Sequence, residues 1–498
     1  MNVNPITRLD YPDPDVIRVE DTYYMVSTTM HFMPGCEILQ SFDLVHWEHV
    51  TYVYETLDHT DAQQLKSGQN IYGQGMWAAS LRYHEGRFCI CFVANDTRKT
   101  YLYTSEKIDG PWKKQLIEGF YHDGSLLFDE DGRNYIVYGN DEIWITELNE
   151  DLTAPKKDGL HRLLVSDHKN PELGYEGSHI QKINGYYYIF LIHSLRDRWM
   201  RTEACFYSDS LEGEFTGGDV LCDDRGYCGQ GVAQGGIVDT PDGKWYAMLF
   251  QDSGAVGRIP ILLPVTWKDH FPFFGQNGHV PEEIEVHSTR PGYIYQPLVG
   301  SDDFCNGLLP RWQFNHDSDP RYYHLDALQG TYTITTREVC TELTQAVNTL
   351  TQRMSYPSCA AEVTVDASAL KEGDVAGLCA LQSCYAAVGI TKHHGKYEVL
   401  MLDKKEDGIL DMTEGTVVES HQMDFRLEAD FCNMKDEARC YYRVNKGDWL
   451  PIGTVHKLYF KLDHFTGCRF GLFCYAAEET GGSACFRDFK YYDVDEIS

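Results

Sequence analysis

The sequence predicts an all-β protein, a five-bladed β-propeller followed by a β-sandwich of the lectin-like jelly-roll type. Three observations lead to this prediction. Apolar residues almost never recur with helical spacing, and short aromatic and β-branched runs alternate with tight turns. In addition, one unit of four strands repeats five times in the first half of the chain.

Each repeat contains a tight acidic or glycine-containing turn that leads into an aromatic strand. Asn-Gly and Asp-Gly pairs supply the positive φ angles that two-residue hairpins need. The five copies are Glu20-Asp21 before TYYMV, Glu85-Gly86 before RFCICFV, Asp131-Gly132 before RNYIVY, Asn184-Gly185 before YYYIFL and Asp242-Gly243 before KWYAMLF. A jelly roll or a pair of sandwiches is the alternative architecture, but neither explains five copies of one unit.

The residues that open the five repeats are Asp13, Trp77, Asp123, Glu176 and Gln234. In a propeller the first strand of each blade lines the central channel, so these positions should converge around one axis. Three of the five are carboxylates, each flanked by Pro, Gly or Ser. The alternative interpretation is three solvated or salt-bridged loop acids.

Three convergent acids suit the hydrolysis of a glycosidic bond. One carboxylic acid protonates the leaving oxygen and one carboxylate acts on the opposite side of the sugar, while a third raises the pKa of the acid. A calcium site would need about six to eight oxygen ligands, and no loop of the DxDxDG type is present. No P-loop and no GxSxG elbow occur either. Two other hypotheses are a non-catalytic sugar-binding propeller and a protein-interaction scaffold.

Several residues near these acids are candidates for sugar binding. Phe32, Trp77 and Phe120 offer flat apolar faces against which sugar C–H groups pack, although packing between blades is the alternative role for each. Arg258 is a cation that can fix a hydroxyl group or an acid, and Gln234 is the polar candidate that opens the fifth repeat.

Composition restricts the partners. The net charge of −32 argues against nucleic acid, whose phosphates need a basic face, and against an anionic membrane surface. No apolar run approaches the roughly 20 residues of a transmembrane helix, and the N-terminus lacks the features of a secretory signal. The sixteen cysteines show no paired spacing, which favours free thiols in a reducing compartment. We therefore expect a cytoplasmic protein that acts on imported oligosaccharides; homo-oligomerisation is left open.

Five segments, one for each repeat, also carry a family resemblance. They are YPDPDVIRVEDTYYMVSTTMHFMPGCEILQSFDLVHWEHV, GQGMWAASLRYHEGRF, HDGSLLFDEDGRNYIVYGN, YEGSHIQKINGYYYIF and AQGGIVDTPDGKWYAMLFQDSGAVGRIPILLPVTW. Together they resemble glycoside hydrolase family 43, the β-xylosidases and α-L-arabinofuranosidases. The resemblance implies that Asp13 is the general base, Asp123 the pKa modulator and Glu176 the general acid. It also implies inversion of configuration, with the base and acid carboxyl groups about 6.5–9.5 Å apart.

The chain departs from the family pattern at several positions. Gly124 and Ser178 stand where many relatives have proline, and His31 and Phe32 replace an acid and a tryptophan. Ala233 stands where many relatives have a histidine that contacts a central ion, often calcium. We therefore expect no cofactor to be required for the chemistry and no metal-ligating residues, with a structural Ca²⁺ ion kept as an open alternative.

The second half of the chain predicts a separate sandwich. A Pro- and Gly-rich stretch at about 268–300 interrupts the repeat, so we place the propeller at 1–290 and the sandwich at 300–498. In FRLEADF, apolar and charged residues alternate as in a half-solvated strand, and SDDFCNGLLPRWQFNH resembles the start of the family's lectin-like sandwich. We expect it to pack on the propeller and shape the funnel's rim.

From the sequence, the function is predicted to be that of an exo-acting, inverting α-L-arabinofuranosidase that removes arabinose from arabinoxylan-derived oligosaccharides. The arabinose preference depends mainly on QDSGAVGRIP in the fifth repeat, which looks closer to that branch of the family. A β-xylosidase, or an enzyme with both activities, is the alternative. The predicted partners are therefore arabinose- or xylose-containing oligosaccharides.

Overall fold

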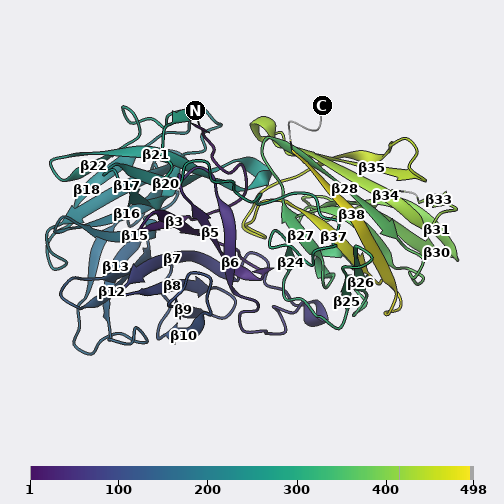
Figure 1. Ribbon diagram of the computed structural model, residues 1–498, viewed down its shortest axis with the longest axis horizontal. Helices are drawn as coiled ribbons and strands as arrows, with labels where there is room; N and C mark the ends of the chain where they lie inside the picture. The colour runs from purple at the N-terminus through teal and green to yellow at the C-terminus, as the bar shows by residue number, and fades with distance from the viewer. Residues whose placement is uncertain (1, 414, 494–498) are drawn as a thin grey trace.

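The computed structural model describes residues 2–413 and 415–493, and nearly all of its regular structure is β-strand. Two domains lie side by side: the N-terminal half forms a propeller and the C-terminal half forms a two-sheet sandwich (Figure 1). Both parts of the fold prediction are confirmed. In the described part of the chain, the helices are single 3-10 turns of three residues, none of which could cross a bilayer.

The propeller consists of five antiparallel four-stranded sheets in chain order. Blades one to three contain β2 (Asp15–Val19), β3 (Thr22–Val26), β5 (Gly35–Ser41) and β6 (Glu48–Tyr54); β7 (Met76–His84), β8 (Arg87–Ala94), β9 (Lys99–Ser105) and β10 (Lys113–Ile117); and β11 (Ser125–Phe128), β12 (Asn134–Asn140), β13 (Glu142–Leu148) and β14 (His161–Ser166). Blades four and five contain β15 (Glu176–Ile183), β16 (Tyr186–Ser194), β17 (Arg201–Ser208) and β18 (Thr216–Leu221); and β19 (Ala233–Asp239), β20 (Trp245–Asp252), β21 (Arg258–Lys268) and β22 (Phe271–Phe274).

The five predicted turns all join the innermost strand of a blade to its second strand. The backbone there adopts the left-handed region, with φ of 57° at Glu20, 77° at Gly86, 82° at Gly132, 84° at Gly185 and 81° at Gly243. No atom lies within 4 Å of a Cβ built on any of the four glycines. Glycine is therefore needed for its backbone conformation and not for space.

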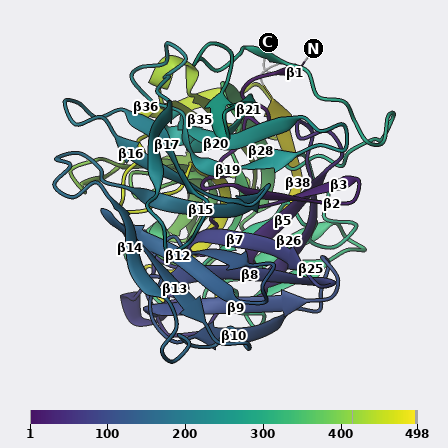
Figure 2. The same cartoon turned by 90° about the vertical axis from the view of Figure 1, so that its left-hand side faces the viewer.

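The N-terminal segment ties the first blade to the last. Strand β1 (Asn2–Val3) pairs with β23 (Glu283–Ile284), which follows the fifth blade. The side chain of Asn4 donates to the carbonyl of Leu262 at 2.7 Å and accepts the N–H of Leu262 at 3.0 Å. The ring of blades is thereby closed by hydrogen bonds between the two ends of the domain. Figure 2 faces the propeller end, with the sandwich behind it.

The sandwich packs two antiparallel sheets over one large core. One sheet contains β32 (Leu410–Met412), β31 (Lys396–Lys404), β30 (Ala386–His393), β29 (Val375–Leu381), β37 (Arg469–Tyr475), β27 (Leu350–Arg353), β24 (Gln313–Asn315), β4 (Phe32–Met33) and, paired with β31, β33 (Thr416–Val418). The other contains β25 (Tyr323–Asp326), β26 (Thr331–Thr335), β38 (Ser483–Asp493), β28 (Ser358–Asp366), β34 (Gln422–Asp430), β35 (Glu437–Val444) and β36 (Leu450–Lys457). In β34, Phe425, Leu427 and Ala429 enter the core while Arg426 and Glu428 stay partly exposed, as the alternation predicts.

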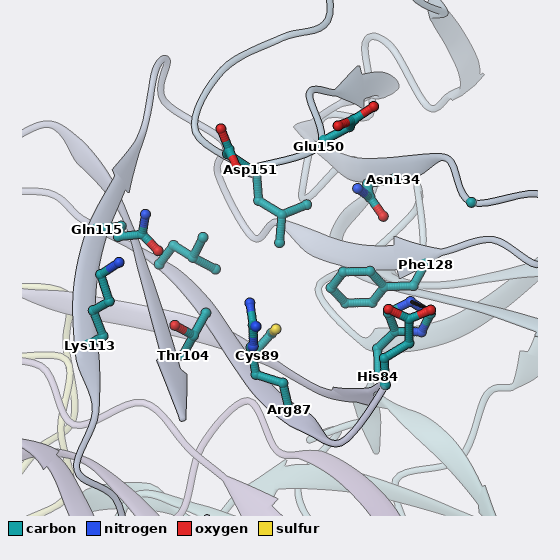
Figure 3. A pocket seen from close by; sticks show the side chains of 14 residues that line it. His84, Arg87, Cys89, Thr104, Lys113, Gln115, Phe128, Asn134, Glu150 and Asp151 are labelled. Atoms are coloured by element: carbon teal, nitrogen blue, oxygen red, sulfur yellow. Dashed lines mark ion pairs between the residues drawn. The ribbon is translucent and has the colours of Figure 1, made fainter. Parts of the chain in front are cut away.

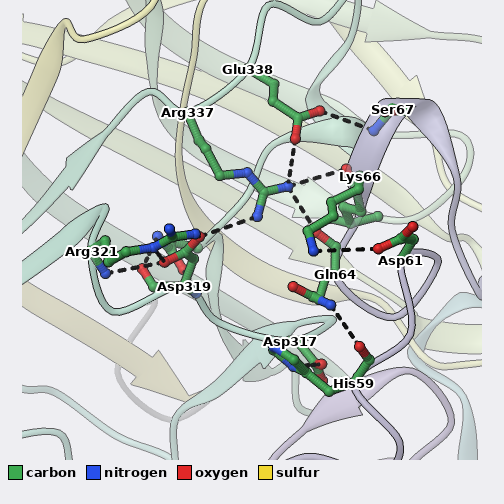
Figure 4. Close-up of polar contacts among 12 residues, drawn as sticks. His59, Asp61, Gln64, Lys66, Ser67, Asp317, Asp319, Arg321, Arg337 and Glu338 are labelled. Carbon is green, nitrogen blue, oxygen red and sulfur yellow. Dashed lines mark hydrogen bonds and ion pairs between the residues drawn. The ribbon is translucent and has the colours of Figure 1, made fainter.

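Strand pairing crosses the boundary between the two domains. The last blade strand ends at Phe274 and the first sandwich strand in chain order begins at Gln313, but β4 belongs to the propeller segment and pairs with β24. Hydrogen bonds reinforce this contact: His59 Nδ1 lies 2.6 Å from Asp317 Oδ2, and Ser67 N–H donates to Glu338 at 3.0 Å (Figure 4). The domains are therefore joined by backbone and side-chain contacts.

Candidate active site

The structure brings Asp13, Asp123 and Glu176 together at one end of the propeller. They lie at or just before the starts of the innermost strands β2, β11 and β15, which all begin at this end. Asp13 and Asp123 are buried, whereas the side chain of Glu176 is 22% exposed. Both Asp13 and Glu176 act electrostatically on Asp123, so the three acids lie close together. The spatial convergence that the repeat predicts is present.

The backbone at these positions is unusual. Asp13, Asp123 and Gln234 have φ angles of 53°, 48° and 59°, which non-glycine residues adopt rarely. Register shifts at the same place in blades two, four and five, between Trp77 and Ser80 and between Glu176 and His179 among others, bend the strand starts. β-Bulges of this kind redirect side chains at the rim of a sheet.

Two donors hold the carboxylate of Asp13. Arg258 Nη1 donates to Oδ1 at 2.8 Å, and the hydroxyl of Thr28 donates to Oδ2 at 2.5 Å. Arg258 is 2% exposed, and its Nε and Nη2 have no hydrogen-bond partner among the described residues. Both of these nitrogens are shielded from solvent. Arg258 thus fixes an acid, one of the two roles predicted for it.

Asp123 is the acid whose protonation is most perturbed. Burial, together with the charges of Glu176 and Asp13, raises the pKa of Asp123 to about 6, against the opposing effects of His122 and the Gly177 N–H. That N–H donates to Oδ2 of Asp123 at 2.9 Å. Gly177 has a φ of 65°, and a Cβ there would lie 2.7 Å from the side chain of Gln234, so only glycine fits.

His122 is a site residue that the sequence reasoning missed, although it precedes Asp123 directly. Its Nε2 lies 3.4 Å from Glu176 Oε2 and 3.6 Å from Asp123 Oδ2. Burial lowers the pKa of His122, but Asp123, Glu176 and Asp13 outweigh burial and raise it to about 9. Ligand atoms of His122, Asp123 and Glu176 lie within 4.8 Å of one another, as in a metal site. With its pKa raised, His122 is a cation at neutral pH that lies between the carboxyl groups of Asp123 and Glu176.

Aromatic side chains from both domains lie beside these acids. The ring of Trp77 lies 6.1 Å from His122 and 5.4 Å from Phe465, which belongs to a loop of the sandwich. The guanidinium carbon of Arg258 lies 4.3 Å from the centre of the Phe465 ring. Trp77 is therefore placed as predicted. Phe465 was missed, because no local pattern shows which sandwich loop reaches the propeller.

The prediction that Phe32 lines the sugar site is wrong. Phe32 is 1% exposed in β4, packs in a core cluster with Leu343 and Phe473 of the sandwich, and has the guanidinium of Arg469 3.4 Å above its ring centre. Pairing of β4 with the sandwich sheet turns this side chain into the domain interface. Phe120 lies beneath the guanidinium of Arg98, 4.0 Å from the centre of its ring, and its predicted contact with a sugar stays a prediction.

Gln234 is 5% exposed, and its side chain packs against Gly177 beside the third acid. Its backbone N–H donates to Glu203 at 2.7 Å.

A separate cavity of about 400 Å³ lies between blades two and three (Figure 3). His84 stacks on Phe128 there, with ring centroids 4.6 Å apart, and Lys113, Gln115 and Asn134 provide polar groups. Because His84, Glu85 and Arg87 belong to the hairpin turn that ends β7, the cavity lies at the end of the propeller opposite the three acids. It is not part of the acid site.

The structure is a five-bladed propeller in which three carboxyl groups converge beside the rings of Trp77 and Phe465. This arrangement is typical of a glycoside hydrolase. Comparison with known proteins narrows the class: the family model described as glycosyl hydrolases family 43 matches residues 3–272, and the model of a β-xylosidase C-terminal concanavalin A-like domain matches residues 301–492. The chain belongs to glycoside hydrolase family 43, whose members hydrolyse glycosidic bonds.

Individual relatives agree with this assignment. A β-xylosidase of Formosa agariphila is 26% identical, over 99% of this chain and 89% of that protein. A solved structure titled a bifunctional GH43-CE of Bacteroides eggerthii is 42% identical with a TM-score of 0.93; the match covers all of this chain but 64% of that one. A second solved structure, titled as an engineered GH43 enzyme with endo-xylanase and exo-arabinofuranosidase activity, is 27% identical over 99% of both chains with a TM-score of 0.86.

Proposed function

We propose that the protein is an exo-acting, inverting glycosidase that releases a terminal pentose from short xylan-derived oligosaccharides, with α-L-arabinofuranose as the first candidate. The observation that carries the proposal is the meeting of three carboxyl groups whose surroundings differ. Asp13 is held by a guanidinium and a hydroxyl group, Asp123 is buried with its pKa at about 6, and Glu176 remains partly exposed.

In this mechanism Glu176 is the general acid and Asp13 the general base. Glu176 gives its proton to the glycosidic oxygen while a water molecule attacks the anomeric carbon from the other face, and the water's proton passes to Asp13. Asn140 donates to Oε2 of Glu176 at 2.8 Å, which orients the acid and leaves its other oxygen for the substrate. Asp123 and His122 set the charge around the acid. No step requires a cofactor.

The walls of the pocket support exo action on a small sugar. Trp77 and Phe465 stand 5.4 Å apart by ring centroids and present apolar surface, and Arg258 has two unused donors. Aromatic faces against sugar C–H groups, with a buried cation for hydroxyl groups, suit one terminal residue. The engineered relative with exo-arabinofuranosidase activity is in keeping with arabinose as the released sugar.

A β-xylosidase is the second candidate. Most of the curated relatives have β-xylosidase names, among them those of Formosa agariphila, Escherichia coli and Bacillus subtilis. A xylopyranoside and an arabinofuranoside both present a pentose with the same groups for acid–base catalysis, so the site described above serves either sugar.

The test is hydrolysis of p-nitrophenyl α-L-arabinofuranoside and p-nitrophenyl β-D-xyloside by the wild type, with proton NMR of the first anomer formed. We expect one of the two sugars to be released with inverted configuration. Glu176→Ala and Asp13→Asn should each lower kcat by at least about 100-fold, the usual range for acid–base residues. Glu130→Ala removes an exposed carboxylate as the matched control and should have no effect. Retained configuration, or full activity of Glu176→Ala, would refute the proposal.

A further inference from the structure

Arg82, on β7, lies on the axis of the propeller below the acids. Its side chain is 13% exposed and borders an opening lined by the innermost strands of all five blades. Every polar nitrogen of the guanidinium is hydrogen-bonded. Nε donates to Leu126 O at 2.9 Å. Nη1 donates to Asp15 Oδ2 at 2.8 Å and to Leu81 O at 2.6 Å. Nη2 donates to Ser125 Oγ at 2.7 Å and to Ile180 O at 3.2 Å.

The positions of these acceptors relate Arg82 to the chemistry. Asp15 follows Asp13 by two residues, Ser125 follows Asp123 by two, and Ile180 follows Glu176 by four. One guanidinium therefore binds the strand that carries each of the three acids. The hydroxyl of Ser125 also accepts the N–H of Ile180 at 3.1 Å, which adds a direct bond between two of these strands.

A metal ion does not fit on this part of the axis. Asp15 Oδ2 accepts from Leu81 N–H and Arg82, and its Oδ1 lies 3.1 Å from His179 Nδ1, so both carboxylate oxygens are used. Ala233, which stands where relatives have an ion-contacting histidine, is buried among Ile192 and Phe250. The carboxylate oxygens of Asp15 are therefore already used in hydrogen bonds and are not free to bind a metal ion. The positive charge of the Arg82 guanidinium also repels a second cation.

We propose that Arg82 is a positioning residue that holds the three acid-bearing strands in register around the axis. The positioning role rests on the proposed catalytic function of the acids. A planar guanidinium suits this role because its five donors point in fixed directions, toward several strands at once. A lysine ammonium has three donors on a flexible stem and cannot reproduce that geometry.

The first experiment compares variants of Arg82 with a matched inter-blade arginine. Arg82→Lys keeps the charge, and the double variant R82M/D15N removes both partners so that no buried charge is left alone. Arg18→Met breaks the inter-blade ion pair with Asp239 and serves as the control. We expect kcat to fall about 10-fold in Arg82→Lys and about 100-fold in the double variant, with KM within about twofold, because small displacements of catalytic groups reduce rate strongly. Arg18→Met should retain wild-type kcat.

Chemical rescue separates positioning from general loss of structure. Millimolar guanidinium ion should restore part of kcat to Arg82→Ala, whereas ammonium at the same concentration should not. The second experiment measures bound metals in the purified wild type by mass spectrometry, and its Tm with EDTA and with added calcium. We expect no stoichiometric metal and the same Tm in both conditions.

Each result has a defined meaning. Wild-type kcat in both Arg82→Lys and the double variant, or loss of fold by circular dichroism in every Arg82 variant, would overturn the positioning role. A stoichiometric metal whose removal lowers Tm would contradict the conclusion that no ion fits beside Arg82. If the wild type cleaved no glycoside, the proposed function would fail, while the metal and Tm measurements would still test whether Arg82 is the only cation bound by these strands.

Discussion

Replacing His122 with glutamine should move the pH dependence of activity upward. The substitution removes the imidazolium that lies 3.6 Å from Asp123 and 3.4 Å from Glu176, yet keeps a hydrogen-bonding side chain of similar reach. The charge of His122 is one of the influences that lower the pKa of Asp123, which is about 6 in the wild type. Without it, Asp123 should keep its proton to a higher pH.

The size of the shift follows from the geometry. Two unit charges 3.6 Å apart interact by about 4 to 5 kcal/mol at an effective dielectric constant of about 20, which corresponds to about 3 pKa units. This is an upper limit, because the imidazole of His122 is 20% exposed and water screens it. The proposed mechanism requires Asp123 as a carboxylate. The acidic limb of the pH profile of kcat/KM should therefore move to higher pH by between about 1 and 3 pH units.

The assay is kcat/KM from about pH 4 to pH 10 on whichever pentoside the wild type cleaves. His193→Gln is the matched control, because His193 is also buried and lies 2.8 Å from a carboxylate, Asp219, outside the three acids. The control should have the wild-type profile. An acidic limb that stays in place in His122→Gln, or that moves to lower pH, would show that His122 carries no charge at the site.

The same variant tests stability. The pKa of His122 is raised from 6.5 to about 9 in the fold, so its contribution is complete below pH 6.5 and is lost as the pH rises through 9. The difference in the free energy of unfolding between wild type and His122→Gln should be up to about 3 kcal/mol at pH 6 and should vanish above pH 9. Urea denaturation at the two pH values measures it. An equal difference at both would contradict a charged His122.

Three further predictions concern other parts of the molecule. Burial raises the pKa of Glu203 well above its ordinary value of 4.5, so Glu203→Gln should change the free energy of unfolding by less than about 1 kcal/mol at pH 4 and increase it at pH 7. A large loss at pH 7 would indicate an ionised Glu203. Burial raises the pKa of Glu37, but Arg353 and His49 outweigh burial and lower it to about 2. Glu37→Gln should therefore lower the free energy of unfolding by about 3 to 5 kcal/mol at pH 7. In urea denaturation this loss of stability should shrink as the pH falls from 4.5 toward 2. Phe465→Ala should lower kcat/KM by about 10-fold, mainly through KM, in steady-state kinetics; an unchanged KM would remove Phe465 from the sugar site.

The propeller and its acids were predictable because their signals are local and repeated. Each hairpin turn, such as Asn184-Gly185, identifies the end of an innermost strand, and the residue that opens the same strand then lies on the axis. Glu176 and Asp123 could be placed in this way without any knowledge of long-range contacts. A radial architecture converts position within a repeat into position in space.

The aromatic residues were less predictable, because their positions depend on contacts between the two domains. Phe32 and Trp77 looked alike as candidates, but the sandwich sheet takes up the strand of Phe32 and buries its ring under Arg469. Phe465 lies in a loop without periodicity, far from the acids in sequence. No spacing rule reports pairing between an isolated two-residue strand and a distant sheet.

The two domains form one site through the buried carboxyl group of Asp10. One of its oxygens accepts the backbone N–H of Arg258 at 2.7 Å, and the other accepts the N–H of Gly467 at 2.8 Å. Arg258 holds Asp13, the proposed base, and Gly467 follows Phe465 by two residues. A Cβ on Gly467 would lie 2.1 Å from the carbonyl oxygen of Val256, so the sandwich loop can come this close only with glycine there. Because Arg258 and the loop of Phe465 are both anchored to Asp10, a displacement of either domain would change the distance between Asp13 and Phe465.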